Sequence, residues 1–392
     1  MLFVPIYLLI LIVLTNRYLA GLFFKQVRGA RFDETVRRSY EPSVAVVVPL
    51  YNEGKGIYQT VLSLLEQDYP ADKLCVTVVD DCSTDDSYHW AEQAALAHPD
   101  RVTLLRNPCN MGKRRGISRA VRQLRSEIVV SVDSDVIVDA RAVRELVRRF
   151  TDPSIAAVGG RVNVKNPNDN WLTRMQAIKY HFGFFYLKSL ERAFRTVLCL
   201  SGCLTAYRRS VLLELEPVLV DRRVLGVPIT YGEDRYLTRQ IVKAGYHTVC
   251  TMDAQCWTLA PPTLSKYFSQ QLRWRRSNFI DFLMGLSHVW RLHPCVALHY
   301  YSVFAIQVVY PVAIVMSLLQ GDFWSLAAGH MAFLVGLGTL YRWDTRGLPP
   351  ERRVHPLWFV SLGIIMPVTY LVQNVLSFWT LDSGSWETRN HT

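Results

Sequence analysis

Acidic residues recur in this chain at points where an apolar run ends. Asp81 lies just past the run 76–79, and Asp133 and Asp135 follow the run 127–132. Both runs are typical of buried strands, and ligands of parallel α/β sheets bind at the carboxyl ends of the strands. Carboxylates there can accept hydrogen bonds from a nucleoside, and two of them can coordinate Mg²⁺ or Mn²⁺ beside a diphosphate. A solvated turn rich in Asp and Ser is the alternative interpretation of the first segment.

A basic cluster lies between these two acidic segments. Gly112 precedes Lys113 and Arg114. The glycine permits close backbone approach, and the two cations suit a diphosphate. A run of charged residues more often forms a solvated surface. This cluster indicates a binding site only because it lies between two segments of nucleotide-binding type.

A further acidic pair, Glu233 and Asp234, precedes a helical pattern. Either residue could simply stabilise the first turn of that helix. A glycosyl transfer with inversion, however, needs a carboxylate that removes the proton from the attacking sugar hydroxyl and is separate from the metal pair. Asp234 is the candidate for this base.

Gln270, Arg273 and Trp274 form a QxxRW pattern shortly before a long apolar C-terminal region. An amide, a guanidinium and an indole beside a membrane suit the binding of a sugar chain and a diphosphate at the mouth of a membrane path. The pattern alone is also compatible with a surface turn of an amphipathic helix.

The order of these motifs, together with SGCLTAYR at 201–208, resembles the processive family 2 glycosyltransferases over residues 41–290. Within that family the chain is most similar to hyaluronan synthases and to rhizobial chitooligosaccharide synthases. The resemblance implies a GT-A, Rossmann-like α/β domain that transfers sugar from UDP-sugar donors to a growing polysaccharide acceptor. For the donor site, the resemblance implies that Asp81 binds uridine, that Lys113 and Arg114 bind the diphosphate, and that Asp133 and Asp135 bind the metal and the donor. It implies substrate binding by Glu233 and the role of base for Asp234. It further implies that Gln270, Arg273 and Trp274 bind the diphosphate and the acceptor, and that Trp343, Thr345 and Arg346 belong to a gating loop.

The product is less well defined than the reaction. Hyaluronan synthase, using UDP-N-acetylglucosamine and UDP-glucuronate, is the leading hypothesis, and a chitooligosaccharide synthase is the alternative. Two departures from the hyaluronan synthase pattern matter: Cys203 stands where those enzymes usually have proline, and Glu233 gives EDR where they commonly have DDR. EDR is the form of the chitooligosaccharide enzymes. Transfer to a lipid or protein, and a sugar-binding membrane protein without activity, are the minor alternatives.

Composition and hydropathy place this site beside a lipid bilayer. The 392 residues carry a net charge of +11, and basic residues flank apolar segments, which favours a membrane over nucleic acid as the partner. We expect an N-terminal transmembrane anchor at 1–24, a catalytic domain at 41–260, a QxxRW-bearing interfacial region at 261–293 and a transmembrane region at 294–392. About four transmembrane helices result, one of them N-terminal.

Charge and polar residues predict how these segments are arranged. Arginines between the last two spans indicate a cytoplasmic loop, so the catalytic domain is predicted to face the cytoplasm at the cell membrane. The stretches 171–194 and 264–290 have the pattern of in-plane interfacial helices or of ordinary packing helices. Several polar residues fall within the spans, where they could line a wet path or bond helix to helix. They are His299, Gln307, His330, Gln373 and Asn374.

Overall fold

The computed structural model describes residues 23, 36, 39–224, 226–349 and 353–381. These residues form two compact units. The sheet unit comprises the described residues of 31–163 and 195–259, and the helical unit comprises 164–194 and the described residues of 260–381. The N-terminal anchor predicted at 1–24 lies outside the described residues apart from Phe23.

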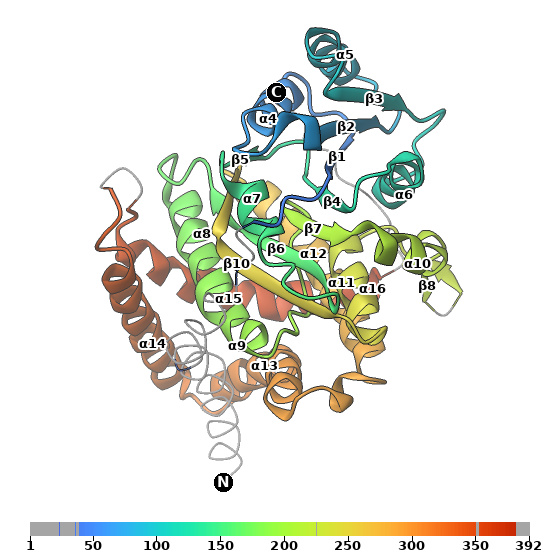
Figure 1. The fold of residues 1–392 in the computed structure, drawn as a ribbon. Helices are drawn as coiled ribbons and strands as arrows, with labels where there is room; N and C mark the ends of the chain where they lie inside the picture. Colours follow the sequence, from blue (N-terminus) through green and yellow to red (C-terminus); the bar gives the residue numbers. More distant parts are fainter. Residues whose placement is uncertain (1–22, 24–35, 37–38, 225, 350–352, 382–392) are drawn as a thin grey trace. The chain divides into compact units, whose positions relative to one another are not determined.

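The sheet unit is built on a mixed sheet whose described strands run in the order β3-β2-β1-β4-β7-β6-β10-β5 (Figure 1). Strands β1 to β4 form the parallel part, whereas β7 pairs antiparallel with both β4 and β6. The bounds are β1 (Val44–Leu50), β2 (Leu74–Asp80), β3 (Val102–Arg106), β4 (Ile128–Ser131), β5 (Ile137–Val138), β6 (Ile155–Val164), β7 (Thr205–Arg208) and β10 (His247–Thr258).

The sequence explains why the parallel strands form at the centre. β1 reads VAVVVPL and β4 reads IVVS, and β-branched runs of this kind fit a sheet that is covered on both faces. Val47 pairs with Thr77 of β2 on one side and with Ser131 of β4 on the other. The carboxyl ends of β1, β2 and β4 therefore meet at one edge, as the sequence predicts.

Helices connect and cover the strands, and three of them pack together around a shared core. Val121, Leu212 and Ile241 come from α6, α10 and α11, and they contact buried residues of β4 and β7 in that core. The helices of the sheet unit are α4 (Gly56–Leu65), α5 (Ser87–Ala97), α6 (Lys113–Gln123), α7 (Ala142–Val147), α10 (Arg209–Val220) and α11 (Glu233–Lys243), and a short hairpin, β8 (Arg223–Val224) with β9 (Val227–Pro228), lies between α10 and α11.

The helical unit has its own core, in which Phe182, Tyr267 and Leu337 are buried together. Its elements are α8 (Trp171–Phe182), the π-helix η3 (Gly183–Leu187), α9 (Lys188–Ala193), α12 (Leu264–Gly285), the 3₁₀ turn η4 (Val289–Arg291), α13 (Pro294–Leu319), α14 (Phe323–Asp344), the 3₁₀-helix η6 (Pro356–Ser361), α15 (Leu362–Val368), the π-helix η7 (Thr369–Gln373) and α16 (Asn374–Trp379). Residues 164–194, which the sequence places within the catalytic domain, group with this unit because α8 contributes to its core.

Among the described residues, three helical segments are long and apolar enough to cross a membrane: Pro294–Leu319, Phe323–Asp344 and Pro356–Trp379. They correspond to the three C-terminal spans that the sequence predicts. The second span continues as helix to Asp344, four residues beyond its apolar part, and it therefore takes in Trp343 of the expected gating loop. Hydropathy marks where a helix is apolar, but a helix ends only where its backbone hydrogen bonds end.

Candidate active site

The ends of the parallel strands carry a network of side-chain to backbone hydrogen bonds. Asp81, at the end of β2, accepts from the Asn107 amide group at 2.8 Å and from the backbone amides of Met111 at 2.8 Å and Gly112 at 2.7 Å. Gly112 has φ 83°, a conformation that favours glycine, and it directly precedes α6. Asp81 thus lies at the predicted edge, where it also fixes the loop that leads into the basic cluster.

Lys113 is the centre of a partly buried ion cluster. Its ammonium lies 2.5 Å from Asp133 Oδ1 and 2.9 Å from Glu233 Oε1. Burial by itself would lower the pKa of Lys113, but the Asp133 and Glu233 carboxylates raise that pKa well above its ordinary value. The first turn of α6, the end of β4 and the first turn of α11 therefore meet at one charged point. Lys113 neutralises two carboxylates here, a role that the basic run in the sequence does not reveal.

Gly202 lies against this cluster. A Cβ atom at this position would come within 3.0 Å of Lys113 Nζ and 3.6 Å of both Asp133 oxygens, so a larger residue would crowd the ion pair. The backbone amide of Gly202 also donates to Asp234 Oδ2 at 3.3 Å. The SGCL segment thus brings the ion cluster and the candidate base together.

Asp234 and Glu233 are adjacent in the chain, yet their surroundings shift their pKa values in opposite directions. Burial, reinforced by the negative charge of Glu233, raises the pKa of Asp234. Burial also opposes ionisation of Glu233, but the Lys113 ammonium outweighs it and lowers the pKa of Glu233. Two neighbouring carboxyl groups whose pKa values are pushed apart can take different parts in acid–base chemistry. The arrangement keeps Glu233 charged and makes Asp234 the better proton acceptor.

Two arginines hold the backbone that precedes this acidic pair. Arg222 is 2% exposed, and its guanidinium donates to the carbonyls of Tyr231 at 2.8 Å and Gly232 at 3.3 Å. It also lies over the Tyr236 ring, 4.4 Å from the centroid. Arg114 donates to the carbonyl of Ile229. The segment that ends at Asp234 is therefore fixed by Arg222, which lies between α10 and β8, and by Arg114 of α6. No sequence motif pointed to Arg222.

Asp133 and Asp135 differ in their partners. Asp133 is ion-paired with Lys113, whereas Asp135 Oδ2 accepts a hydrogen bond from the Thr258 hydroxyl at 2.8 Å. No group of three or more His, Cys, Asp and Glu side chains with metal-binding geometry occurs in the described part of the chain. The two carboxylates can supply hard oxygen ligands, and a Mg²⁺ or Mn²⁺ ion held here would take its remaining ligands from phosphate and water.

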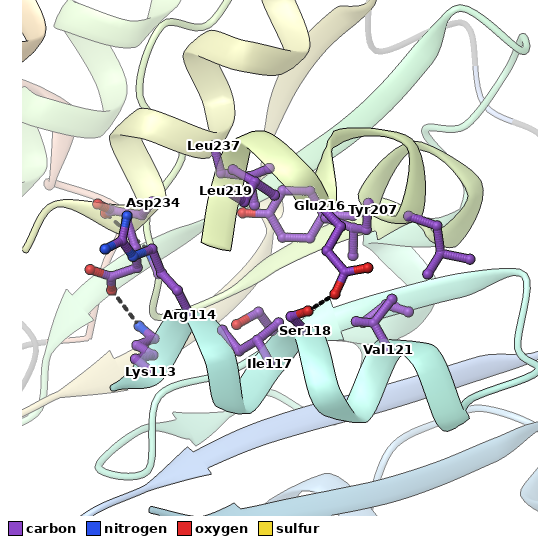
Figure 2. A pocket seen from close by; sticks show the side chains of 16 residues that line it. Lys113, Arg114, Ile117, Ser118, Val121, Tyr207, Glu216, Leu219, Asp234 and Leu237 are labelled. Carbon is purple, nitrogen blue, oxygen red and sulfur yellow. Dashed lines mark hydrogen bonds and ion pairs between the residues drawn. The ribbon is translucent and has the colours of Figure 1, made fainter. Parts of the chain in front are cut away.

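A cavity extends from these charged groups into the core between α6, α10 and α11 (Figure 2). Its interior measures about 60 Å³, and together with the open solvent at its mouth it takes in about 710 Å³ of space. Lys113, Gly202, Glu233 and Asp234 line one end, and apolar side chains, among them Ile117, Val121, Leu212, Leu219 and Leu237, line most of the rest. The base therefore lies between a charged cluster and an apolar wall, which is the physical source of its raised pKa.

The QxxRW residues belong to α12 of the helical unit. Gln270, Arg273 and Trp274 are spaced i, i+3 and i+4, so they share one face of the helix. Trp274 is exposed, as a platform for a ligand must be. On another face, the buried Gln271 accepts from Lys179 Nζ of α8 at 2.7 Å, which anchors the helix within its unit.

The predicted gating residues lie at the end of α14 and in the turn after it. Trp343 is exposed and lies beneath the Arg346 guanidinium, 4.1 Å from ring centroid to Cζ, whereas Thr345 is buried. Between them, Asp344 accepts from the Tyr186 hydroxyl and lies 3.2 Å from His181 Nε2. These contacts attach the end of α14 to α8 and to the π-helix η3.

Polar residues within the predicted spans bond helix to helix. Gln373 donates to the carbonyl of Phe268 at 2.9 Å, and Asn374 donates to the carbonyl of Gln307 at 2.8 Å. The Tyr310 hydroxyl lies 3.0 Å from His330 Nδ1. These contacts favour the second of the two interpretations that the sequence leaves open.

The chain matches known proteins along most of this architecture. Residues 42–277 match the family described as glycosyltransferase like family 2. An N-acetylglucosaminyltransferase of Rhizobium leguminosarum bv. viciae is 37% identical over 246 residues, which is 62% of this chain and 58% of that protein. One from Rhizobium meliloti is 35% identical over 65% of this chain and 60% of its own length. The chain thus spans less than two thirds of these relatives.

Two further similarities bear on product and fold. A hyaluronan synthase of Streptococcus pyogenes is 31% identical over 67% of this chain and 62% of its own length. Among solved structures, the mannosyltransferase PcManGT of Pyrobaculum calidifontis, in complex with GDP-Man and Mn²⁺, aligns with a TM-score of 0.61 and 23% identity. That alignment covers 95% of this chain and 99% of the other. The predicted GT-A fold is confirmed.

Proposed function

Because the chain belongs to the glycosyltransferase-like family 2, we propose that it transfers N-acetylglucosamine, with inversion, from UDP-N-acetylglucosamine to the hydroxyl of a growing β-linked chain. The observation that carries the proposal is the Asp234 carboxylate, which is partly buried at the cavity, has a raised pKa and is separate from the Asp133 and Asp135 pair. Inverting transfer needs such a base within reach of the acceptor.

In the proposed step, the transferred proton and the leaving group each have a destination. Asp234 takes the proton of the acceptor hydroxyl as its oxygen forms a bond to C1 of the donor sugar. The bond from C1 to the phosphate oxygen breaks, and UDP leaves with the electron pair. Arg222 and the Gly202 amide hold Asp234 in place for this transfer. Lys113 keeps Glu233 ionised, so Glu233 does not compete with Asp234 for the proton.

A divalent cation suits the other carboxylates of the site. Asp135, oriented by Thr258, and Asp133 would hold Mg²⁺ or Mn²⁺, which would neutralise the diphosphate of the leaving UDP. The Mn²⁺ of the Pyrobaculum mannosyltransferase is compatible with this assignment. Asp133 and Asp135 would supply two protein carboxylates, and phosphate and water oxygens would complete the usual set for such ions.

The comparisons favour N-acetylglucosamine over the alternating sugars of hyaluronan. The two rhizobial relatives reported above are N-acetylglucosaminyltransferases at 35–37% identity, whereas the hyaluronan synthase is 31% identical. The sequence also has the EDR form at Glu233 to Arg235. The alternative product therefore replaces hyaluronan as the leading hypothesis.

Elongation and export are the part of the proposal that depends on the helical unit. Trp274 offers an exposed indole on which an acceptor sugar can stack, and three apolar segments can anchor the enzyme in a membrane. Arg342, Arg346 and Arg353 cluster near the end of α14 and support a cytoplasmic position for that end. The proposed enzyme works at the cytoplasmic face, where UDP-sugars are made.

The test is to incubate membranes that contain the full chain with each UDP-sugar alone and in pairs. We expect UDP-N-acetylglucosamine alone to give oligomers that chitinase digests. Polymer that forms only with UDP-glucuronate also present, and that hyaluronidase digests, would restore hyaluronan as the product. Membranes with Asp234→Asn serve as the control for background synthesis.

A further inference from the structure

The cavity beside Asp234 is larger and more apolar than proton transfer requires. Figure 2 shows its walls running along α6 from Lys113 to Val121, with α10 and α11 opposite. Ile117, Leu219 and Leu237 contribute aliphatic side chains to the wall. The well-packed interiors of proteins leave few voids, so an apolar cavity that reaches a catalytic group is a site for a ligand group.

Two of the polar side chains that line this cavity, Ser118 and Glu216, are bonded to each other. The Ser118 hydroxyl donates to Glu216 Oε1, and Arg122 Nε lies 2.7 Å from the same oxygen. A sugar hydroxyl placed among the aliphatic side chains would lose its hydrogen bonds to water without replacement. The wall therefore selects an apolar substituent. Tyr207, whose hydroxyl lies on the Leu219 side of the cavity in Figure 2, offers one polar group near the charged end.

The chemistry of the step limits which substituents can reach the cavity, and the apolar wall disfavours the hydroxyl groups that flank the attacking oxygen of the acceptor. Asp234 must come within about 3 Å of the acceptor oxygen, and that oxygen within about 3 Å of C1 of the donor sugar. C2 is bonded to C1, so the group on C2 of the donor lies beside Asp234 when the reaction occurs. In an N-acetylhexosamine that group is an amide that ends in a methyl.

We propose that the cavity between α6, α10 and α11 receives the 2-N-acyl group of the donor sugar, with Ile117, Leu219 and Leu237 as the residues that determine donor specificity. The inference rests on the proposed transfer of N-acetylglucosamine. It makes a prediction that goes beyond that transfer. Because the cavity continues along α6 past the space that an acetyl group needs, the enzyme accepts donors with longer N-acyl groups.

The experiment compares kcat/KM for three donors, UDP-N-acetylglucosamine, its N-butanoyl analogue and UDP-glucose, with the full-length enzyme in membranes. We expect the parent to use both N-acyl donors within about tenfold of each other, because the cavity has room for the longer chain. It should use UDP-glucose at least about tenfold less well, because that donor places no apolar group in the cavity. Rejection of the N-butanoyl donor by the parent would overturn the proposal.

Variants of the wall locate the acyl group. Ile117→Phe fills the cavity and should lower kcat/KM for the N-butanoyl donor at least about tenfold more than for UDP-glucose. The matched control is Leu124→Phe, which adds the same ring at the end of α6 in the same core but outside the cavity lining. The control should leave the ratio between donors unchanged, and equal losses for all donors in Ile117→Phe would contradict the assignment.

A second variant changes the cavity in the opposite direction and keeps the proposal testable if the first variant misfolds. Leu219→Ala enlarges the cavity and should raise use of the N-butanoyl donor relative to the N-acetyl donor. An unchanged ratio in this variant would contradict the proposal even if Ile117→Phe did not fold. Failure of the proposed function itself looks different, because the parent would then make no product from UDP-N-acetylglucosamine alone.

Discussion

The two units of this protein use buried polar side chains in different ways. In the sheet unit, Lys113 binds Asp133 and Glu233 in a charged cluster that shifts pKa values around Asp234. In the helical unit, Gln373 and Asn374 each donate to a backbone carbonyl of a neighbouring helix. The first arrangement costs desolvation and prepares a proton transfer, whereas the second satisfies polar groups that hydrocarbon would penalise. In this protein, buried polar side chains point to catalysis where they form ion pairs that shift pKa values, and to helix packing where they only donate to backbone carbonyls.

The largest effect expected from this comparison is that of Asp234→Asn. The amide keeps the shape of the side chain but cannot accept the acceptor's proton, so transfer should fall by about 10²–10⁴-fold. UDP affinity, measured by titration calorimetry on the purified enzyme, should stay within about twofold of the parent, because Asp234 is separate from the candidate nucleotide ligands. Transfer at the parent rate would remove Asp234 from the role of base.

A second substitution breaks the charged cluster itself. Lys113→Met leaves the partly buried Asp133 and Glu233 without their counter-ion. We expect the free energy of unfolding to fall, by less than the roughly 3–5 kcal/mol that loss of a fully buried partner costs. Denaturant unfolding of the detergent-solubilised protein measures it. Adding Glu233→Gln should recover part of the loss, since one uncompensated charge is removed. No recovery in the double variant would show that Glu233 is not coupled to Lys113.

A third substitution tests positioning rather than charge. Arg222→Lys loses the planar guanidinium that lies over the Tyr236 ring and donates from Nη1 to the Tyr231 and Gly232 carbonyls, so the backbone before Asp234 loses a constraint. We expect kcat to fall by about tenfold or more with the donor KM nearly unchanged, as small displacements of a catalytic group are costly. The exposed neighbour Arg223 provides the control, Arg223→Lys, which should be silent. Equal changes in both variants would argue against a special role for Arg222.

The smallest effect is expected in the helical unit. Gln373→Leu removes a hydrogen bond to Phe268 but also an amide oxygen that has no partner in the structure. The net change in the free energy of unfolding should be about 1 kcal/mol or less, read as a small shift in Tm. Elongation should persist. Loss of elongation at unchanged stability would instead indicate that Gln373 contacts the moving polymer.

The sequence predicted the edge of the sheet well because its signals there are local. Apolar runs that end in Asp81 and Asp133 identify strands and their ends, and Asp234 follows a glycine that can adopt the left-handed conformation. The proposal that Asp234 is the base, separate from the Asp133 and Asp135 pair, could be made from the sequence alone. The three long apolar helices of the C-terminal region followed from the same kind of signal, whereas the GT-A fold was implied by the resemblance of the motifs to family 2 glycosyltransferases.

What the sequence could not reveal depends on contacts between distant segments. Diphosphate binding by Lys113 stays a prediction, but its two ion pairs could not be foreseen, because a long flexible side chain contacts whichever carboxylates the fold brings near it, and here these lie after β4 and at the start of α11. Arg222 and Thr258 carry no motif, because their partners lie in other elements. The cavity likewise arises from the packing of three helices that are separated in the chain.

The central claim is that Asp234 is the base of an N-acetylglucosaminyl transfer, and the pH dependence of kcat/KM with UDP-N-acetylglucosamine tests it most directly. A base must be deprotonated, so activity should fall as pH falls through the pKa of Asp234, which lies above the ordinary aspartate value. Glu233 raises that pKa, and its removal also leaves more of the Lys113 charge to act on Asp234. The acid limb of Glu233→Gln should therefore move to lower pH than in the parent. An acid limb that stays in place or moves to higher pH would contradict the account.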